Sequence, residues 1–376
     1  MKIAVNTRLL LQGKLEGIGW FTYETLKRIT QAHPEHHFYF IFDRPYSDEF
    51  LFGENVTPIV AYPPTRHPFL WYIYFEYTLP RILKKIKPDL FLSPDGWVSL
   101  RTPIKTVNVI HDLNFEHHPE FIKPIVRKYY LRFFHRFAAK AARIATVSEF
   151  TKQDIHQLYH IPLEKIDVVY NGANQVFQPL PEADKIIVRE DYSQGVPFFL
   201  FVGLIHKRKN IDNIFSAFDA YKEEVGGEVK LVVVGEKKWW KGELEDAFLG
   251  MKHQNEVIFL GRQPSDILAK LMASAEALLY PSIFEGFGIP IIEAFHAETA
   301  VITSNTTSMP EVAGDAALLV DPYSVQDIKA AMKHISLNNL LREELIAKGR
   351  IQRQKFSWNK TAEALWEAVN EALTSR

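Results

Sequence analysis

The sequence predicts an α/β protein with two doubly wound domains, each a parallel β-sheet covered by helices. Short apolar runs alternate with helical segments along the whole chain, as in repeated strand–helix units. The chain has 376 residues, more than one hydrophobic core usually supports, so two domains are expected. A stretch at residues 178–181 with two prolines is the expected hinge. We therefore assign residues 1–177 to a first domain and residues 178–357 to a second.

Each domain is expected to contain a series of buried strands. In the first domain the apolar runs lie at residues 3–5, 38–42, 56–60, 89–92, 106–110, 144–147 and 166–169. In the second domain they lie at residues 198–202, 231–234, 257–259, 277–279, 301–303 and 318–320. The final segment, residues 356–373, has an apolar helical face and follows a complete second domain. We expect this C-terminal helix, within residues 358–376, to return to the first domain.

Composition narrows the classes of function. The formal net charge of −1 gives no general attraction to nucleic acid or to anionic membranes. Cysteine is absent, which excludes disulfides and thiolate metal sites, and His33, His36, His37, His117 and His118 follow no recognised metal-ligand spacing. The first residues do not resemble a signal peptide, and no apolar stretch is long enough to span a bilayer. We expect a cytoplasmic protein without a metal site.

The most informative stretch, PSIFEGFGIPIIEA, runs from Pro281 to Ala294. It follows an apolar strand, passes through the turn Gly286-Phe287-Gly288, and enters an apolar helix near Pro290. A glycine turn before a helix N-terminus favours anions, because free N–H groups and the helix dipole point outward together. Two carboxylates, Glu285 and Glu293, flank the turn. We interpret the stretch as a sugar-nucleotide site; the alternative is an ordinary strand–turn–helix connection.

A second candidate site follows the first strand of the second domain. Gly203 ends that strand, and the loop after it leads through His206 and Lys207 to Arg208 and Lys209 at the start of a helix. Cations are unusual there, because a helix N-terminus prefers acidic groups. One interpretation is that these cations bind a dianionic group through charge-assisted hydrogen bonds. The alternative is that they are solvent-exposed charged side chains that bind no ligand. Arg262, at the end of another strand, is expected to border a nucleotide base.

In the first domain, a loop with Gly13, Gly17 and Gly19 precedes a helix that ends near residue 31. Such a loop lets a ligand approach the backbone, although glycine is common in loops generally. His111 ends a predicted strand, at the sheet edge where ligands collect in parallel sheets. A histidine there bonds a sugar hydroxyl or shares a proton; alternatively, its ring is held by local backbone.

The segment from Phe121 to Arg143 contains no acidic residue. Basic side chains recur at every fourth position, which places them along one face of a helix: Lys128, Arg132, Arg136 and Lys140. Apolar side chains form the opposite stripe, at Tyr130, Phe133, Phe134, Phe137 and Ala141. The cationic face fits peripheral contact with an anionic membrane or a lipid-linked acceptor. Equally, it fits a solvated amphipathic helix that packs on the sheet.

Taken together, these runs resemble the retaining glycosyltransferases of the family-4 type, which have the two-domain GT-B fold with two Rossmann-like domains facing an interdomain cleft. The resemblance covers nearly the whole chain. It is carried by GIG at 17–19, VIHDL at 109–113, TVSEF at 146–150, NGA at 171–173, the FVG…RKN run at 201–210 and EGFG…E at 285–293. Within the family the pattern is most similar to bacterial mannosyltransferases of surface-polysaccharide assembly.

The resemblance implies a role for each matching residue of the second domain. Arg208 and Lys209 would hold the donor diphosphate, Glu293 the ribose hydroxyls and Glu285 the transferred sugar. Gly286, Phe287 and Gly288 would contact sugar and phosphate through their backbone. Many relatives carry arginine where this chain has Leu204, directly after Gly203, so diphosphate binding would depend more on Arg208 and Lys209.

In the first domain, His111 would lie at the reacting face of the sugar, and Gly19 would let its loop approach the diphosphate. The implied reaction moves a hexose, mannose from GDP-mannose being favoured, from a nucleoside-diphosphate sugar to a saccharide or lipid-linked acceptor. Configuration would be retained by a front-face route, without a metal cofactor. The alternatives are another enzyme on this fold, such as a sugar-nucleotide epimerase, or a non-catalytic nucleotide-sugar-binding protein. Nucleic acid is not an expected partner, because the net charge is near zero.

Overall fold

A computed structural model of the protein describes residues 1–237 and 240–374. The chain forms two compact units: unit 1 contains Met1–Asn171 and Ser357–Arg376, and unit 2 contains Gly172–Phe356. Residues 172–177, which we expected in the first domain, group with unit 2. Each unit is a parallel sheet between two layers of helices, as the alternating strand and helix pattern predicts.

The sheet of unit 1 has seven parallel strands in the order β3-β2-β1-β4-β5-β6-β7. Their bounds are β1 Lys2–Asn6, β2 His37–Phe42, β3 Val56–Val60, β4 Leu90–Ser93, β5 Thr106–Ile110, β6 Arg143–Thr146 and β7 Ile166–Val168. Central strands such as β5 are buried at every position, because helices cover both faces of a parallel sheet. The strand order reverses between β1 and β4, which creates a crevice at their carboxyl ends.

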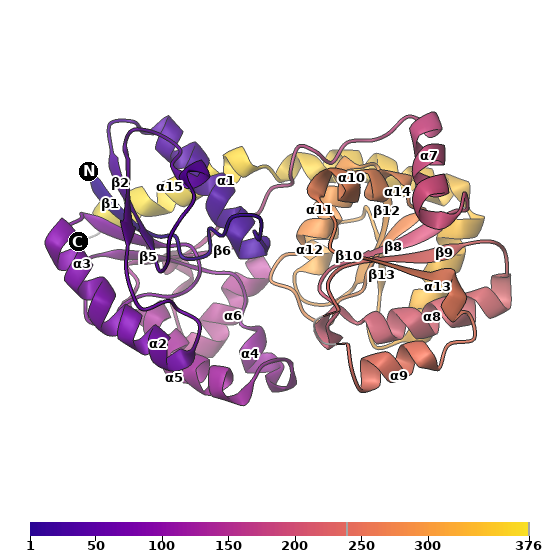
Figure 1. Ribbon diagram of the computed structural model, residues 1–376, viewed down its shortest axis with the longest axis horizontal. Coiled ribbons are helices and arrows are strands. Elements are labelled where there is room, and N and C mark those ends of the chain that lie inside the picture. Colours follow the sequence, from indigo (N-terminus) through magenta and orange to yellow (C-terminus); the bar gives the residue numbers. More distant parts are fainter. Residues whose placement is uncertain (238–239, 375–376) are drawn as a thin grey trace. The chain divides into compact units, whose positions relative to one another are not determined.

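Two helices that are far apart in sequence cover one face of this sheet: α1 (Gly17–Ala32) and α15 (Trp358–Thr374) (Figure 1). The return of the C-terminal helix to the first unit is therefore confirmed. The hydroxyl of Thr361 in α15 donates to the carbonyl of Tyr170, 2.6 Å away. The opposite face carries α2 (Pro68–Ile73), α3 (Leu79–Ile86), α5 (Pro124–Lys140) and α6 (Glu149–Tyr159), with the short α4 (Asn114–His117) beside α5.

Unit 2 contains a six-stranded parallel sheet in the order β10-β9-β8-β11-β12-β13. The strands are β8 Phe198–Val202, β9 Lys230–Val234, β10 Val257–Gly261, β11 Ala277–Tyr280, β12 Ala300–Ser304 and β13 Leu318–Val320. Every strand expected in either domain is present, so the doubly wound architecture is confirmed. Here the strand order reverses between β8 and β11, which places the crevice of unit 2 beside the stretch from Pro281 to Ala294.

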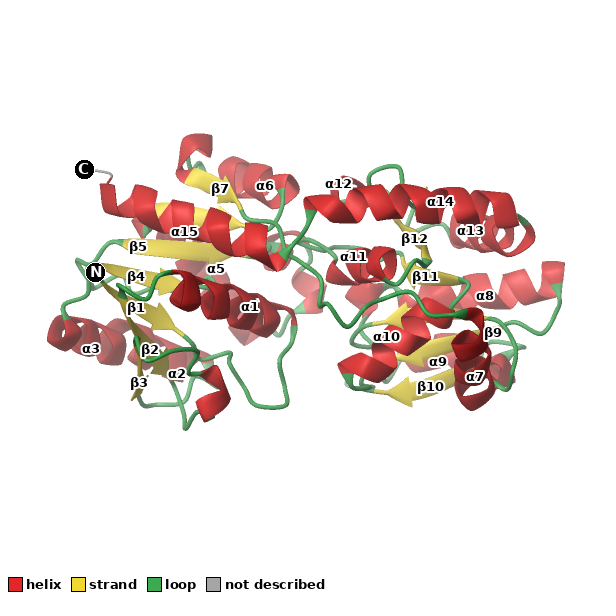
Figure 2. Ribbon diagram, turned by 90° about the horizontal axis from the view of Figure 1, so that it is seen from above, coloured by secondary structure: helices red, strands yellow, loops and turns green. Residues whose placement is uncertain are grey.

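The helices of unit 2 also form two layers (Figure 2). One layer holds α8 (Ile211–Val225), α9 (Glu243–Leu249) and α13 (Val325–Leu337). The other holds α7 (Glu182–Ser193), α10 (Ser265–Ser274), α11 (Ile289–His296) and α14 (Asn339–Gln352), while α12 (Met309–Ala313) follows β12. Within the described ranges, no helix is both long and apolar enough to cross a bilayer.

Candidate active site

Two glycines allow the loops of unit 2 to cross at the carboxyl ends of β8 and β9. Gly203 has φ +149° and Gly235 has φ +159°, in a region that side-chain-bearing residues rarely adopt. A Cβ atom at Gly235 would lie 1.8 Å from the carbonyl oxygen of Gly203, so no other residue fits there. We did not single out Gly235 from the sequence, although its position directly after a run of valines marks it as a strand end.

The cations of the second candidate site form one turn of 3-10 helix, Lys207–Lys209, ahead of α8. The turn ends at Asn210, whose φ of 61° is left-handed. The Asn210 side-chain amide donates to the carbonyls of Pro281 at 2.9 Å and Pro322 at 2.6 Å. These bonds fix the cationic turn against the end of β11, so two segments about 70 residues apart in the sequence form one site.

Glu285 lies at the centre of this site. Lys209 Nζ is 2.6 Å from its Oε1, and Arg208 Nη1 is 3.0 Å from its Oε2. Burial tends to raise the pKa of Glu285, but the charges of Arg208 and Lys209 outweigh it and hold the pKa at about 2. Lys209 Nζ also donates to the hydroxyl of Tyr280 at 2.7 Å. Two cations therefore share one carboxylate, and this group of three side chains, the Glu285 cluster, has a net positive charge.

The glycine turn after Glu285 is held by its backbone. Ser308 Oγ donates to the carbonyl of Glu285 at 2.9 Å and to that of Phe287 at 3.1 Å. Gly288 has φ +103° and directly precedes α11, so the turn enters the helix through a backbone conformation that glycine adopts most readily. The ring of Phe287 is buried and packs edge-on against Phe356, 5.5 Å away. Side-chain and backbone contacts thus fix the turn before any ligand binds.

Glu293 differs from Glu285 although it is only eight positions away. It lies in α11 and is partly exposed, and among the described residues no charged side chain offsets the effect of its burial. Burial raises the pKa of Glu293 to about 8, so the side chain is largely protonated at neutral pH. A protonated carboxyl both donates and accepts hydrogen bonds.

Arg262 is exposed and directly follows β10, at the outer edge of the sheet. Strand β9 lies between β10 and β8, so the strand that precedes Arg262 is about 10 Å from β8, the strand that Gly203 follows. It belongs to the rim of the crevice rather than to the Glu285 cluster.

The ring of His111 in unit 1 lies at the carboxyl end of β5. Its Nε2 is 2.7 Å from the carbonyl oxygen of Pro94, and the ring packs edge-on against Phe21. Burial lowers the pKa of His111, which favours the neutral ring. Because Nε2 must then carry the proton that Pro94 accepts, Nδ1 is left as a hydrogen-bond acceptor.

Gly19 is not in a loop, which corrects our expectation. Gly17 and Gly19 lie in the first turn of α1, which begins directly after Glu16. A Cβ atom at Gly19 would lie 3.1 Å from the carbonyl oxygen of Leu9 and 3.2 Å from the side chain of Leu15. The absence of a side chain therefore lets the start of the helix pack closely on the loop that follows β1.

A buried ion pair at the β1–β4 crevice was missed in the sequence. Arg8 Nε lies 2.5 Å from Asp95 Oδ2, and both side chains are buried. The guanidinium of Arg8 lies 4.6 Å from the ring of Trp97, and Asn6 donates to Asp95 at 2.8 Å. Isolated polar residues within apolar surroundings carry no recognisable motif, so only the strand order brings these side chains together.

Helix α5 confirms the two stripes expected between Phe121 and Arg143. All four basic residues of the stripe are exposed: Lys128, Arg132, Arg136 and Lys140. On the other side, Phe133, Phe134 and Phe137 are buried, but Tyr129 rather than Tyr130 is the deeper tyrosine.

Family models match both halves of the chain. The model described as "Glycosyl transferases group 1" matches residues 183–352, and "Glycosyltransferase Family 4" matches residues 15–175. The chain is a glycosyltransferase of the family-4 type. The match to the first model contains both the Glu285 cluster and Glu293, while His111 lies within the second.

Curated relatives cover most of the enzyme. "O-antigen chain mannosyltransferase B" from Escherichia coli is 28% identical over 359 residues, which are 92% of this chain and 93% of the relative. "O-antigen chain mannosyltransferase RfbU" from Salmonella typhimurium is 29% identical and covers 75% of this chain and 74% of its own.

Solved structures share the fold. A glycosyltransferase from Rickettsia africae aligns with a TM-score of 0.74 at 19% identity, over 100% of this chain and 99% of that one. Anabaena Alr3699/HepE, crystallised with UDP and glucose, aligns with a TM-score of 0.77 at 16% identity, over 98% and 99%. At these identities the likeness shows the GT-B fold alone, which agrees with the two parallel sheets.

Proposed function

We propose that the enzyme transfers mannose from GDP-mannose to a hydroxyl group of a saccharide or lipid-linked acceptor, with retention of anomeric configuration. The observation that carries the donor class is the Glu285 cluster, whose net positive charge lies at the strand ends where parallel sheets bind ligands. Mannose as the donor sugar is supported by the relatives from Escherichia coli and Salmonella typhimurium, which are both named mannosyltransferases.

In this proposal the diphosphate binds Arg208 and Lys209. Negative charge grows on the diphosphate as its bond to the sugar breaks, and fixed cations stabilise that charge without having to reorganise. Hydrogen bonds between Lys209 and both Tyr280 and Glu285 hold the ammonium in place beforehand. The positive end of the helix dipole of α11 adds to the positive potential.

The two glutamates have separate tasks. Glu285, ionised and held by two cations, accepts hydrogen bonds from hydroxyls of the transferred sugar. Glu293, largely protonated at neutral pH, bonds the ribose hydroxyls, and Arg262 borders the base at the rim. Gly203 and the turn Gly286-Phe287-Gly288 bring backbone close to the phosphate and sugar.

The strong pairing of Glu285 favours a front-face reaction. A carboxylate with a pKa of about 2 is a weak base and a weak nucleophile, which disfavours a covalent glycosyl-enzyme intermediate. Instead, the bond from the anomeric carbon to the phosphate oxygen breaks, and the acceptor oxygen bonds the same face of that carbon. The acceptor proton moves to the departing phosphate. We further propose that His111 bonds the sugar through Nδ1 and that the backbone at Gly19 contacts the diphosphate.

No metal is required in this scheme, because Arg208 and Lys209 supply the positive charge.

The acceptor is bound on the unit 1 side, and the enzyme works in the cytoplasm at the inner membrane face. Peripheral membrane contact through α5 is supported by its exposed basic stripe and by two exposed apolar side chains, Ile125 at 55% and Phe69 of the neighbouring α2 at 66%.

The decisive experiment incubates the protein with GDP-, UDP- and ADP-sugars, with and without EDTA, and follows nucleotide release. We expect slow hydrolysis of GDP-mannose that EDTA does not change. Lys209→Ala should lower the rate by about 10²- to 10³-fold, since it removes a fixed donor from the developing charge.

Lys207→Ala is the matched control for this experiment. Lys207 is the neighbouring cation, but it is exposed and pairs with Glu243 instead of Glu285. Its loss should change the rate by less than about threefold. The proposal fails if the protein binds no nucleotide sugar, or if the two variants lose activity equally while both remain folded.

A further inference from the structure

The turn between α1 and β2 brings two histidines and a glutamate together. His33 follows the last residue of α1, Glu35 and His36 form the turn, and β2 begins at His37. The turn lies at the amino ends of the strands of unit 1, opposite the strand ends where His111 is found. Among the described residues it is the single group of three or more histidine and acidic side chains whose ligand atoms all lie within 4.8 Å of one another.

The distances in this group match a metal coordination shell better than hydrogen bonds. His33 Nδ1 is 3.5 Å and His36 Nε2 is 3.3 Å from Glu35 Oε1. Charge-assisted hydrogen bonds are shorter, about 2.7–2.9 Å. Ligand atoms about 2.1 Å from a tetrahedral Zn²⁺ ion are about 3.4 Å from one another, which is close to both distances, and the two imidazole nitrogens lie within 4.8 Å of each other.

The backbone of the turn is fixed independently of any ion. The side-chain amide nitrogen of Asn55, Nδ2, donates to the backbone carbonyls of Thr30, His33 and His36, at 3.0, 3.2 and 3.2 Å. The N–H of His36 donates to the carbonyl of His33 at 3.1 Å. A site held in this way loses little chain entropy on binding.

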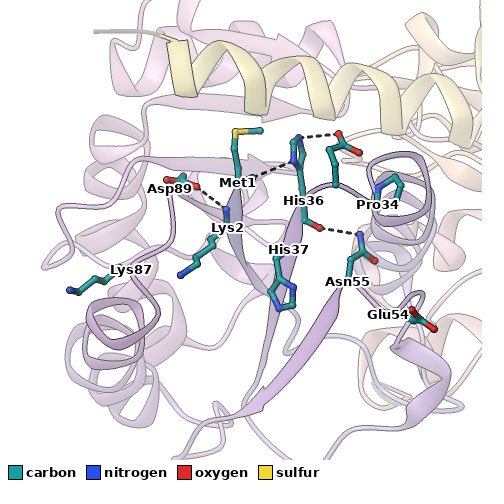
Figure 3. A pocket seen from close by; sticks show the side chains of 10 residues that line it. Met1, Lys2, Pro34, His36, His37, Glu54, Asn55, Lys87 and Asp89 are labelled. Carbon is teal, nitrogen blue, oxygen red and sulfur yellow. Dashed lines mark hydrogen bonds and ion pairs between the residues drawn. The ribbon is translucent and has the colours of Figure 1, made fainter.

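The two imidazole rings are oriented by their neighbours. The indole of Trp366 in α15 stacks on His33 with ring centres 4.1 Å apart and also contacts His36 at 5.3 Å. His36 Nδ1 lies 3.4 Å from the α-amino nitrogen of Met1 (Figure 3), and its Nε2 lies 3.3 Å from Glu35 Oε1. The site is open, since Glu35 and His36 line a depression of about 740 Å³ that Asp89 and Glu54 also border.

We propose that His33, Glu35 and His36 bind one divalent cation of the borderline class, Zn²⁺ above all, with water completing the coordination. Two imidazoles and one carboxylate are a ligand set that zinc accepts in proteins. The ion bridges the end of α1 and the start of β2 beneath Trp366, so it stabilises unit 1 and takes no part in glycosyl transfer. The spacing of these residues in the sequence matches no known metal-binding motif. Their side chains come together only because the turn between α1 and β2 directs them to one point.

The test is calorimetric titration of chelator-stripped protein with ZnCl₂. We expect one site per chain in the wild type and at least tenfold weaker binding in His36→Ala and in Glu35→Gln. Titration with Co²⁺ should give the visible absorption of a tetrahedral complex in the wild type alone.

His37→Ala is the control, because His37 is the next residue but its Nε2 bonds Thr57 Oγ1 at 2.8 Å and its ring points away from His36 (Figure 3). This variant should bind Zn²⁺ like the wild type. Absence of a binding heat in the wild type, or equal binding by all variants, overturns the proposal. Donor hydrolysis by His36→Ala in EDTA should match the wild type, so the metal site and the proposed reaction are tested separately.

Discussion

Both sheets carry a buried ion pair at the place where their strand order reverses, but the two pairs differ in charge balance. In unit 1, Arg8 and Asp95 form a one-to-one pair, with side chains 8% and 3% exposed. In unit 2, two cations share Glu285, and Arg208 and Lys209 remain 25% and 12% exposed. The first pair is neutral and sealed by Trp97 and Phe75, whereas the second is cationic and partly accessible.

The difference supports the donor site that we propose in the crevice of unit 2. A sealed, neutral pair holds the loops after β1 and β4 together and offers no net attraction to an anion. An unbalanced cluster keeps a positive potential that a diphosphate can neutralise, and its partial exposure leaves room for contact. Equivalent positions in two similar sheets thus favour structure in one unit and ligand binding in the other.

Breaking the unit 1 pair should have the largest effect on stability. Arg8→Met leaves Asp95 buried without its cation, and an uncompensated buried charge costs about 3–5 kcal/mol. We expect the free energy of unfolding, measured with urea, to fall by that amount. Lys252→Met is the control: this lysine is 70% exposed and pairs with Glu223, itself 49% exposed, so its loss should leave the free energy of unfolding nearly unchanged. Equal losses would mean that burial does not distinguish the two pairs.

Replacing Glu293 by a group that cannot ionise tests whether this side chain is neutral in the folded protein, as a cationic crevice in unit 2 requires. The pKa of Glu293 is about 8 in the folded protein and 4.5 in its ordinary state, so between these values the folded state holds a proton that the unfolded state has lost. Unfolding free energy therefore falls by up to about 1.4 kcal/mol per pH unit as the pH rises through this window. Glu293→Gln should remove this slope and be more stable than wild type by ~3 kcal/mol at pH 8.5, after allowance for partial exposure.

The measurement is urea unfolding of both proteins at pH 5.5 and pH 8.5. The difference in unfolding free energy between Glu293→Gln and wild type should be smaller at pH 5.5, because wild type loses stability mainly as the pH rises above this value. Glu228→Gln, at an exposed position, is the control for the substitution itself and should be as stable as wild type. A constant difference at both pH values would show that Glu293 is ionised in the fold and that the crevice is less cationic than we infer.

Tyr280→Phe should have the smallest effect. It removes one hydrogen-bond acceptor of Lys209 Nζ while the contact to Glu285 remains. The loss of one hydrogen bond weakens the binding of the donor by about 1 kcal/mol, because the ammonium group is held less firmly in place. We expect KM for the donor to rise about fivefold with little change in thermal stability. Tyr46→Phe, in unit 1, should leave KM unchanged. An unaltered KM in Tyr280→Phe would assign the positioning of Lys209 to Glu285 alone.

The sequence by itself determined the architecture of this protein. Runs such as 106–110 and 198–202 are apolar at nearly every position, because strands buried on both faces must be, and their alternation with helices leaves a parallel sheet as the simplest arrangement. The stretch from Glu285 to Glu293 was also recognisable in the sequence, because its glycines and proline are spaced as in a strand–turn–helix connection.

Tertiary structure alone decided which charges meet. Arg208 and Lys209 are more than 70 positions from Glu285, Arg8 is 87 from Asp95, and only the strand order places their loops side by side. It also decided that Glu285 is ionised and Glu293 largely neutral, because a pKa depends on burial and neighbouring charge rather than on residue type. The position of Gly19 inside α1 and the convergence of His33, Glu35 and His36 were likewise set by packing.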